Sequence, residues 1–360
     1  MTQIEHLPSR VVSVHGKEYL YFSGTSYLGI GMNQEFKKLF VASLEAYGTI
    51  YSASRNNNLT LSIYSAFEKY IANVNAAEDC VSVSSGLLAG QLVVKHLAEF
   101  EFIYAPSVHP AIWAESNFSS PFSDYLDFTA RITQVTQEKK RDIVICCNTI
   151  DPLTCFPYNF GWVKTLPKNK NIILLFDDSH ALGLDSENLD GSFNHGVGNY
   201  KKINSFAGQN VKVIVVSSLA KALGIQGGII LASKNIIGNI RKSPLYAGAS
   251  PIIPAYLVTF LQSRDIYLEM NKQLKYNIAY FKLCCLDILH HFKYLDDYPI
   301  FYIDSKDLYT YLYQQDIIIS SFSYPSPISP SITRIVLSSL HTKEDINMLS
   351  EKLHQFFNLM

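Results

Sequence analysis

The sequence predicts an α/β protein with a mostly parallel central sheet flanked by helices, followed by a smaller α+β C-terminal domain. Short apolar segments alternate with helical stretches between residues 80 and 231, as strands and helices do in such a sheet. Two of these segments, 172–176 and 213–216, are apolar throughout, which is typical of strands buried on both faces. A long helical stretch begins after Pro254, and further short apolar segments follow it.

An N-terminal arm, residues 1–45, is expected to precede a large domain, residues 46–254. The expected elements of this part are a short β pair within residues 10–21, a turn at 27–29, a helix from about Asn33, and helical spacing through 63–71. The strands of the large domain are expected at residues 80–83, 102–104, 143–147, 172–176, 213–216 and 228–231.

The C-terminal small domain is expected to span residues 255–360. Its expected elements are a long helical stretch at 255–291, strands near 300–303, 317–319 and 333–337, and a closing helix from about 343 to 357. Thr342 can cap that closing helix, because a threonine hydroxyl accepts a hydrogen bond from an N–H group of the first turn.

The composition argues against several classes of function. The chain has 360 residues, 48% of them hydrophobic and 17% charged, with a formal net charge of −1. A net charge this close to zero gives no electrostatic case for binding nucleic acid or a membrane surface. The apolar runs are much shorter than the roughly 20 residues that span a bilayer.

The cysteines and the first residues bear on the compartment. The six cysteines follow neither the spacing of a disulfide framework nor that of a zinc site, so no metal is expected and the thiols are interpreted as reduced. The first residues lack the basic and apolar regions of a signal peptide. We therefore expect a cytoplasmic protein without a membrane span.

Lys221 is the most informative residue of the chain. It follows the apolar run 213–216, lies among small residues and precedes a glycine-rich stretch ending at Gly228. Glycines let the backbone pass close to a bulky group, and burial lowers the pKa of a lysine so that its neutral amine can form a Schiff base. The segment therefore fits a lysine that carries a covalent cofactor, although a surface lysine beside a glycine turn stays open.

A second apolar strand ends in a run of polar residues, Asp177-Asp178-Ser179-His180. Parallel sheets place ligands at the carboxyl ends of their strands, so these side chains are expected in the same crevice as Lys221. Pyridoxal 5'-phosphate needs a lysine for its aldehyde and an acid for its pyridine nitrogen, and His180 can serve beside the phenolic oxygen. A helix N-cap after the strand is the structural alternative for Asp177.

These two motifs resemble those of a known family. The segment DDSHALG (177–183) is similar to the Asp-Glu-Ala-His-Ser-x-Gly motif of the α-oxoamine synthases, and SSLAKALGIQGG (217–228) to their Thr-Leu-Ser-Lys-Ala-x-Gly-x-x-Gly-Gly. These enzymes are fold-type I pyridoxal-phosphate-dependent transferases, and the resemblance extends from about Ser23 to about Leu349. It implies that Lys221, Asp177, His180 and His109 are catalytic and contact the cofactor.

The resemblance also implies a set of residues that hold the cofactor. The segment from Ser84 to Gly90 follows a strand and opens a helix, and a helix N-terminus attracts phosphate. Family members bind the cofactor phosphate there, which makes Ser85, Gly86 and Leu87 candidates, although a simple N-cap is also open. The other candidates are the hydroxyl of Ser218, the His109 ring that stacks on the pyridine, and Ser250, which reaches the neighbouring subunit's phosphate.

Structural alternatives remain for the last two: His109 as an ordinary loop residue and Ser250 as a helix cap before Pro251. The role of Ser250 implies a homodimer with shared active sites.

Three residues are expected on the substrate side. Arg334 resembles the family arginine that anchors the substrate's carboxylate, since a guanidinium binds a carboxylate through two parallel bonds. Thr25 stands at the family's substrate-facing asparagine, and Arg55, in a Ser-Arg motif, is expected to position substrate or the dimer partner. The alternatives are a structural ion pair for Arg334 and a surface position for Arg55.

Other positions depart from the family pattern. The family has a glycine where this chain has Leu59 and a histidine where it has Tyr64, and its Glu-Gly-x-x-Ser-Met-x-Gly-Asp segment is degraded at residues 148–155. The cofactor-contacting serine of that segment has no clear counterpart here, and Thr154 is the candidate to substitute for it. Cofactor chemistry is therefore better preserved than substrate recognition.

The resemblance implies an enzyme that condenses a small amino acid with an acyl thioester, on CoA or a carrier protein, to give an α-amino ketone, as 8-amino-7-oxononanoate synthases do. The altered motifs leave two alternatives open. One is a pyridoxal-phosphate-dependent aminotransferase, and the other is a non-catalytic homologue that serves as a binding subunit.

Overall fold

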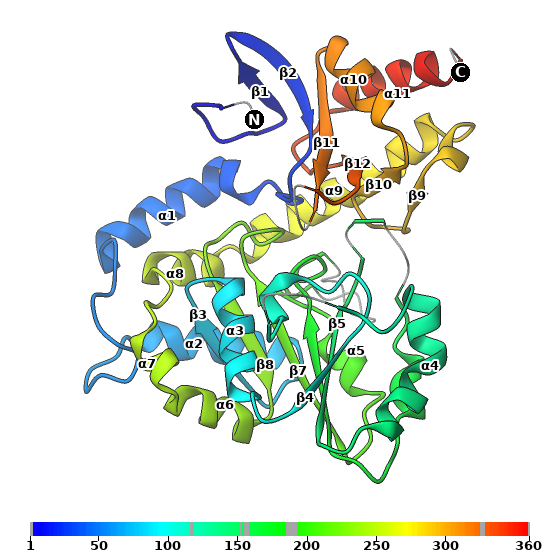
Figure 1. Cartoon of the computed structure of the whole chain (residues 1–360). Helices are drawn as coiled ribbons and strands as arrows, with labels where there is room; N and C mark the ends of the chain where they lie inside the picture. Colours follow the sequence, from blue (N-terminus) through cyan, green and yellow to red (C-terminus); the bar gives the residue numbers. More distant parts are fainter. Residues whose placement is uncertain are drawn as a thin grey trace. The chain divides into compact units, whose positions relative to one another are not determined.

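The structure is a computed structural model that describes residues 3–115, 119–151, 153–154, 158–184, 193–324 and 328–358. The chain divides into two compact units. The larger unit consists of Glu35–Ile150 and Tyr158–Arg264, and the smaller unit of Met1–Gln34, Asp151–Pro157 and Asp265–Met360. Each unit is built around one six-stranded sheet (Figure 1).

The sheet of the larger unit confirms the mostly parallel α/β fold. Its strands are β3 (Asp79–Val83), β4 (Glu101–Tyr104), β5 (Ile143–Asn148), β6 (Ile172–Asp177), β7 (Val211–Ser218) and β8 (Gly228–Ala232). They lie in the order β3-β8-β7-β6-β5-β4, with β4 to β7 mutually parallel and β8 antiparallel to both of its neighbours. Every residue of β5 and β6 is buried, which explains why their sequences are apolar almost without interruption.

Helices flank this sheet, as the alternating pattern predicts (Figure 1). The helices of this part of the chain are α1 (Gln34–Tyr47), α2 (Ser62–Val74), α3 (Gly86–His96), α4 (Tyr125–Glu138), α5 (Tyr200–Asn204), α6 (Lys234–Lys242), α7 (Pro244–Gly248) and α8 (Pro254–Gln262), with short 3-10 turns η2 (Pro110–Ile112) and η3 (Gly161–Thr165). Helix α3 packs against β7 and β8, and α5 packs against β7. The start of α3 is therefore held beside the end of β7.

The smaller unit has the expected α+β character. Its elements are β1 (Val11–Val14), β2 (Lys17–Phe22), η1 (Ile30–Met32), α9 (Arg264–Cys284), η4 (Leu289–His291), β9 (Lys293–Tyr294), β10 (Ile300–Ile303), α10 (Lys306–Gln314), β11 (Ile317–Ser323), β12 (Ser331–Val336) and α11 (Lys343–Asn358). The N-terminal hairpin β1–β2 joins the C-terminal strands, because β2 pairs in parallel with β11. Thr342 and Asp345 cap α11 reciprocally, with hydrogen bonds of 3.3 and 2.9 Å, which confirms the predicted cap.

The prediction of one helical stretch over residues 255–291 is wrong. Helix α8 ends at Gln262, α9 spans Arg264–Cys284, and the single turn η4 follows. At the break, the Ser263 hydroxyl donates to the Thr259 carbonyl at 2.6 Å, in a pattern that competes with the backbone hydrogen bonds of a helix. The hydropathy pattern continues across this break, so it could not reveal the break.

Among the described residues, no helix has both the length and the apolar composition that crossing a bilayer requires.

We expect the buried histidine His341 of the smaller unit to lower the free energy of unfolding in acid. The ring of His341 accepts the N–H of Ser338 at 3.0 Å through Nδ1, so Nε2 carries the proton and donates to the Tyr21 carbonyl at 3.0 Å. Burial lowers the pKa of His341 from 6.5 to about 4. Below pH 6.5 the unfolded chain binds a proton that the folded ring does not, so stability falls from pH 6.5 to about 4, by about 3 kcal/mol for this group.

We expect the thermal midpoint of His341→Gln to fall less between pH 6.5 and 4 than that of the wild type. The exposed His6 provides the control, because His6→Gln is expected to follow the wild-type curve. Parallel curves for His341→Gln and the wild type would contradict the assignment.

Candidate active site

Asp177 is the last residue of β6, where the sheet register places it between Asn148 of β5 and Val216 of β7. Its side chain is buried. Oδ1 accepts the N–H of Ser179 at 2.9 Å, and Oδ2 lies 3.4 Å from Nδ1 of His109. The structure thus brings two of the predicted site residues, Asp177 and His109, into direct contact at the carboxyl edge of the sheet.

His109 is held as a neutral ring. Its Nδ1 accepts the N–H of Ala111 at 3.1 Å, which leaves the proton on Nε2. Burial lowers the pKa of His109, the charge of Asp177 raises it, and the charge of Lys221 lowers it further.

Lys221 lies in a tight turn after β7. The turn is closed by hydrogen bonds from Leu219 N to the Gly227 carbonyl at 2.9 Å and from Gly224 N to the Lys221 carbonyl at 3.2 Å. Gly227 has φ +148°, and a Cβ there would lie 2.6 Å from the Ile252 side chain, so only glycine fits. The structure thus accounts for the glycines on which the sequence argument depended, and the half-buried Lys221 is not an ordinary surface lysine.

The two central motifs are bonded to each other. The hydroxyl of Ser179, which follows β6, accepts the N–H of Ser218 at the end of β7 at 2.8 Å. His180 is the next residue and is half-buried on the turn that leaves β6. Asp177 and His180 on one side and Lys221 on the other therefore belong to neighbouring, bonded turns.

The N-terminus of α3 approaches the same turns. Ser85 caps the helix, and its hydroxyl accepts the N–H of Leu88 at 3.1 Å. A Cβ on Gly86 would lie 2.7 Å from Cβ of Ser218, and one on Gly228 would lie 2.2 Å from the Ser85 carbonyl oxygen. Glycine at both positions lets the helix start meet the ends of β7 and β8.

Ser85 and Leu87 are exposed at the start of this helix, where the peptide dipoles favour an anion. A lysine, a buried carboxylate, a neutral imidazole and an open helix N-terminus thus surround one edge of the sheet. These residues fit the aldehyde, the pyridine nitrogen, the ring face and the phosphate of pyridoxal phosphate.

Arg55 is buried rather than at the surface. Its guanidinium contacts Glu68 Oε1 at 3.0 Å and Ser82 Oγ at 3.3 Å, and it lies 4.0 Å from the ring centre of Tyr64. Glu68 also accepts the N–H and the hydroxyl of Ser82 at 2.9 and 2.7 Å, and it pairs with Arg241 at 3.2 Å. This network braces β3, the strand that leads into the α3 N-terminus.

We expect Glu68→Gln to lower the free energy of unfolding by about 3 kcal/mol, because it leaves the buried charge of Arg55 without its carboxylate partner. Arg241 is a third exposed and keeps its pair with Asp79 at 2.6 Å. Glu35→Gln is the control, since the Glu35–Lys38 pair is exposed and contributes about 0.5 kcal/mol or less. Denaturant unfolding followed by circular dichroism measures both. Equal stability of the two variants would show that the network is not needed.

The remaining predicted site residues belong to other elements. Ser250 is exposed beyond α7, and the N-cap of α8 is Ile253, so Ser250 does not cap that helix. Thr25 and Arg334 belong to the smaller unit. Thr25 is half-buried after β2, and Arg334 is buried in β12 with its guanidinium 5.3 Å from the Phe322 ring.

Among the positions that depart from the family pattern, Tyr64 and Thr154 make hydrogen bonds within the fold. The Tyr64 hydroxyl donates to the Ile252 carbonyl at 2.8 Å, and Leu59 is exposed. The Thr154 hydroxyl donates to Asp151 Oδ2 at 2.5 Å, within a turn of the smaller unit. Pro152 and Cys155 of the degraded segment lie outside the described residues.

The sequence argument missed two buried polar residues beside Asp177. Asp178 accepts hydrogen bonds from Thr149 Oγ1 and from the amide groups of Asn199, and burial raises its pKa to about 6. Asn148 bonds to Ser107 and to His109. Their positions at the ends of β5 and β6 could have indicated a role in the site. Their hydrogen-bond partners, however, lie 21 to 41 residues away in the sequence.

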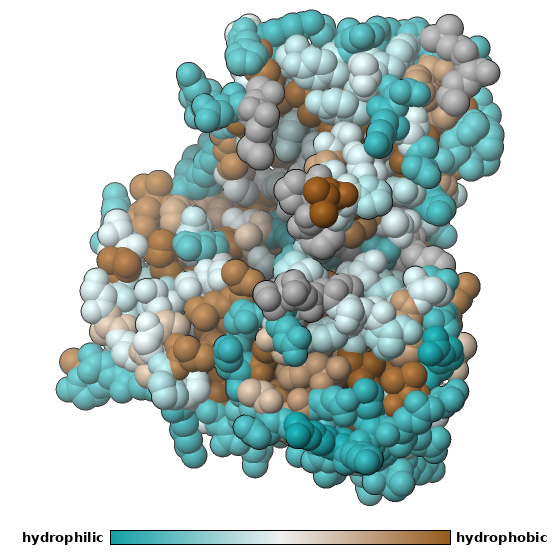
Figure 2. Space-filling model, in the orientation of Figure 1, coloured by the Kyte–Doolittle hydropathy of each residue, from teal (hydrophilic) through white to brown (hydrophobic). Residues whose placement is uncertain are grey.

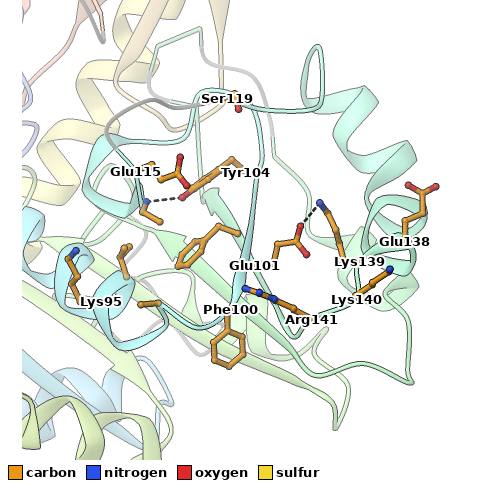
Figure 3. Close-up of a pocket in the computed structure, with 14 residues that line it drawn as sticks. Lys95, Phe100, Glu101, Tyr104, Glu115, Ser119, Glu138, Lys139, Lys140 and Arg141 are labelled. Carbon is orange, nitrogen blue, oxygen red and sulfur yellow. Dashed lines mark hydrogen bonds and ion pairs between the residues drawn. The ribbon is translucent and has the colours of Figure 1, made fainter.

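The larger unit also has a hollow of about 860 Å³ along the edge strand β4, which contains none of the predicted site residues (Figure 3). Lys139 pairs there with Glu101 at 2.7 Å, and the Tyr104 hydroxyl accepts the N–H of Ala114 at 2.8 Å. A second hollow, of about 500 Å³, lies at the amino ends of β5 and β6, where the surface is hydrophilic (Figure 2). Both hollows are lined by Lys140 and Arg141.

The comparisons with known proteins agree with this geometry. The family model for aminotransferase class I and II matches residues 113–353. The chain is 22% identical to an 8-amino-7-oxononanoate synthase of Petrotoga mobilis, with 96% of this chain and 90% of that protein covered. It is 23% identical to a protein of the same name from Thermosipho melanesiensis, with 95% and 89% covered.

Solved structures show the same fold. A serine palmitoyltransferase from S. paucimobilis superposes with a TM-score of 0.80 at 14% identity, over 100% of this chain and 92% of that one. An 8-amino-7-oxononanoate synthase from Francisella tularensis superposes with a TM-score of 0.67 at 18% identity, over 94% and 99%. The fold is therefore that of a fold-type I pyridoxal-phosphate-dependent transferase. This chain belongs to the aminotransferase class I and II family of pyridoxal-phosphate-dependent enzymes.

Proposed function

We propose that this enzyme condenses a small amino acid with an acyl thioester to give an α-amino ketone, with release of the thiol and usually of CO₂. The observation that carries the proposal is the meeting of Asp177, His109 and the turn of Lys221 beside the open N-terminus of α3. Relatives named 8-amino-7-oxononanoate synthase, matched over nearly the whole chain, support this reaction class.

When bound, pyridoxal phosphate supplies an electron sink for the negative charge that develops at the α-carbon of the substrate. In this proposal, Lys221 holds the cofactor through its amine and then, once displaced by the substrate, abstracts the α-proton as a general base. Asp177 keeps the pyridine nitrogen protonated, because a buried carboxylate stabilises the charge of that N–H. The neutral ring of His109 would hold the face of the cofactor ring, and His180 would donate a hydrogen bond to its phenolic oxygen.

The phosphate is assigned to the α3 N-terminus, where Ser85, Gly86 and Leu87 can offer N–H groups, together with the Ser218 hydroxyl. The exposed Ser250 is assigned to the phosphate of a neighbouring subunit, which makes the proposed assembly a homodimer with shared active sites. The family resemblance supports this assignment.

On the substrate side, Arg334 is proposed to bind the carboxylate of the amino acid, and Thr25 to face the substrate. A buried guanidinium pairs strongly with a carboxylate because two parallel N–H···O bonds match its fork. For Arg55, the contacts with Glu68 and Ser82 support a positioning role from behind β3.

Release of the thiol from the acyl thioester tests the reaction class. Purified enzyme with pyridoxal phosphate is mixed with glycine, alanine or serine and an acyl-CoA series, and free CoA is followed with a thiol reagent. Release that requires both substrates supports the condensation, and a carrier-protein thioester is the second donor tested.

Transamination is the second candidate, because the changes at Thr25, Leu59 and Tyr64 affect substrate motifs and the matching family includes aminotransferases. An aminotransferase needs no thioester. The enzyme would therefore be assigned to transamination if it converted an amino acid and a 2-oxo acid without releasing a thiol. Such an assignment also requires that no thioester donor supports condensation.

A further inference from the structure

The side chain of Asn148 connects the end of β5 to the loop that carries His109. Asn148 is 6% exposed and pairs in register with Asp177. Its Nδ2 donates to the Ser107 carbonyl at 2.8 Å, and its Oδ1 accepts the N–H of His109 at 3.2 Å. The first partner can only accept and the second can only donate, so these contacts fix the orientation of the amide.

The loop needs this connection because the strand pairing ends before it. The last backbone bond that joins it to β5 runs from Ala105 N to the Cys146 carbonyl at 2.9 Å. Ser107 then adopts φ +56°, a left-handed conformation that is unfavourable for a residue with a Cβ. The two bonds of Asn148 offset this cost on both sides of the turn.

The ring of His109 depends on the same bonds. Asn148 holds its backbone N–H, while Nδ1 accepts from Ala111 at 3.1 Å and lies 3.4 Å from Asp177 Oδ2. Other bonds support the loop further along: the Gln91 amide donates to the carbonyls of Ala111 and Trp113 at 3.0 and 3.1 Å. Asn148 therefore holds the backbone of His109, while Gln91 holds the carbonyls of Ala111 and Trp113 that follow it.

We propose that Asn148 is a positioning residue, which sets the orientation and the tautomer of the His109 ring that faces the cofactor. The proposal rests on the proposed function for the role of that ring, but not for its geometry. The family motif has glutamate at this position, and a carboxylate cannot donate to the Ser107 carbonyl. This loop therefore depends on a group with both a donor and an acceptor.

The test uses the full chain with ¹⁵N-labelled histidine, free of cofactor, and assigns the His109 signals with His109→Gln. In the wild type, the nitrogen shifts are expected to show a single tautomer with the proton on Nε2. In Asn148→Leu, which loses both bonds, the shifts are expected to move toward an average of the two tautomers. Asn148→Asp keeps the acceptor for the His109 N–H but loses the donor to the Ser107 carbonyl. It is the variant to measure if Asn148→Leu does not fold.

Affinity for pyridoxal 5'-phosphate, followed by quenching of protein fluorescence, is the second measurement. Asn148→Leu is expected to raise the dissociation constant about tenfold, which corresponds to about 1.4 kcal/mol. Gln91→Leu is the comparison variant, because it removes the bonds to the Ala111 and Trp113 carbonyls but keeps both Asn148 bonds and the Ala111 N–H, and it is expected to leave the tautomer unchanged. Thermal midpoints of the two variants are compared so that a general loss of stability is recognised.

Unchanged His109 shifts and affinity in the Asn148 variants would overturn the proposal, as would equal changes in Gln91→Leu. The nitrogen shifts are measured without turnover. If the wild type releases no thiol, the proposed reaction fails, while the shifts still decide whether Asn148 sets the His109 ring.

Discussion

Replacing Lys221 with alanine is expected to lower turnover by about 10⁴-fold or more, the largest effect we predict for a single side chain. The amine both holds the cofactor and transfers the α-proton, and a positioned general base alone contributes about 10²–10⁴-fold. The variant is also expected to lose the visible absorption band that added pyridoxal phosphate gives with the wild type. That band reports the bond to Lys221, so it separates loss of the lysine from loss of the fold.

Lys212→Ala is the matched control for this experiment. Lys212 lies on β7, the strand that leads to the turn of Lys221, but its side chain is exposed. We expect its spectrum and turnover to equal those of the wild type. Near-normal turnover in Lys221→Ala, or an unchanged band, would remove the lysine from the mechanism.

Replacing Asp177 with asparagine is expected to lower kcat by about 10²–10³-fold, the usual cost of removing one preorganised electrostatic group from an active site. The substitution keeps the shape of the side chain, and Oδ1 can still accept the Ser179 N–H that it accepts at 2.9 Å. What it removes is the negative charge, which lies 3.4 Å from His109 Nδ1 and which the proposed mechanism needs at the pyridine nitrogen.

The measurement compares kcat and KM with the absorption maximum of the bound cofactor. A shift of the absorption maximum with a fall mainly in kcat is expected, because the charge acts on the reacting ring and not on substrate binding. Asp142→Asn, at an exposed position just before β5, is the control and is expected to behave like the wild type. An Asp177→Asn variant with wild-type kcat would show that another group protonates the ring.

Much of the larger unit could be predicted from the sequence because its signals are local. The apolar runs of β5 and β6 correspond to strands that are buried on both faces. Polar residues at and directly after the ends of β6 and β7 indicated the carboxyl edge of the sheet, where the structure brings Asp177, Ser179 and Ser218 together. Thr342 at the start of α11 was likewise a signal contained within one turn.

Other features could not be predicted because their partners are distant in the sequence. The hairpin β1–β2 has no local signal that would assign it to a sheet, and only its pairing with β11, through Leu20 and Ile317, does so. The break at Ser263 depends on a side-chain hydrogen bond that hydropathy does not report. Arg55 lies in a polar stretch that suggested a surface loop, but Glu68 and Ser82 bury its charge.

The sequence by itself determined the alternation of strands and helices in the larger unit, the family motifs, and the choice of Lys221, Asp177 and His180 as the proposed chemical core. It could do so because the periodicity of side chains and the glycine-rich turn are properties of short segments. Only the tertiary structure decided which groups hold that core, such as the amide of Asn148 between Ser107 and His109. Hydrogen bonds and ion pairs act over about 3 Å in space, whatever the separation along the chain.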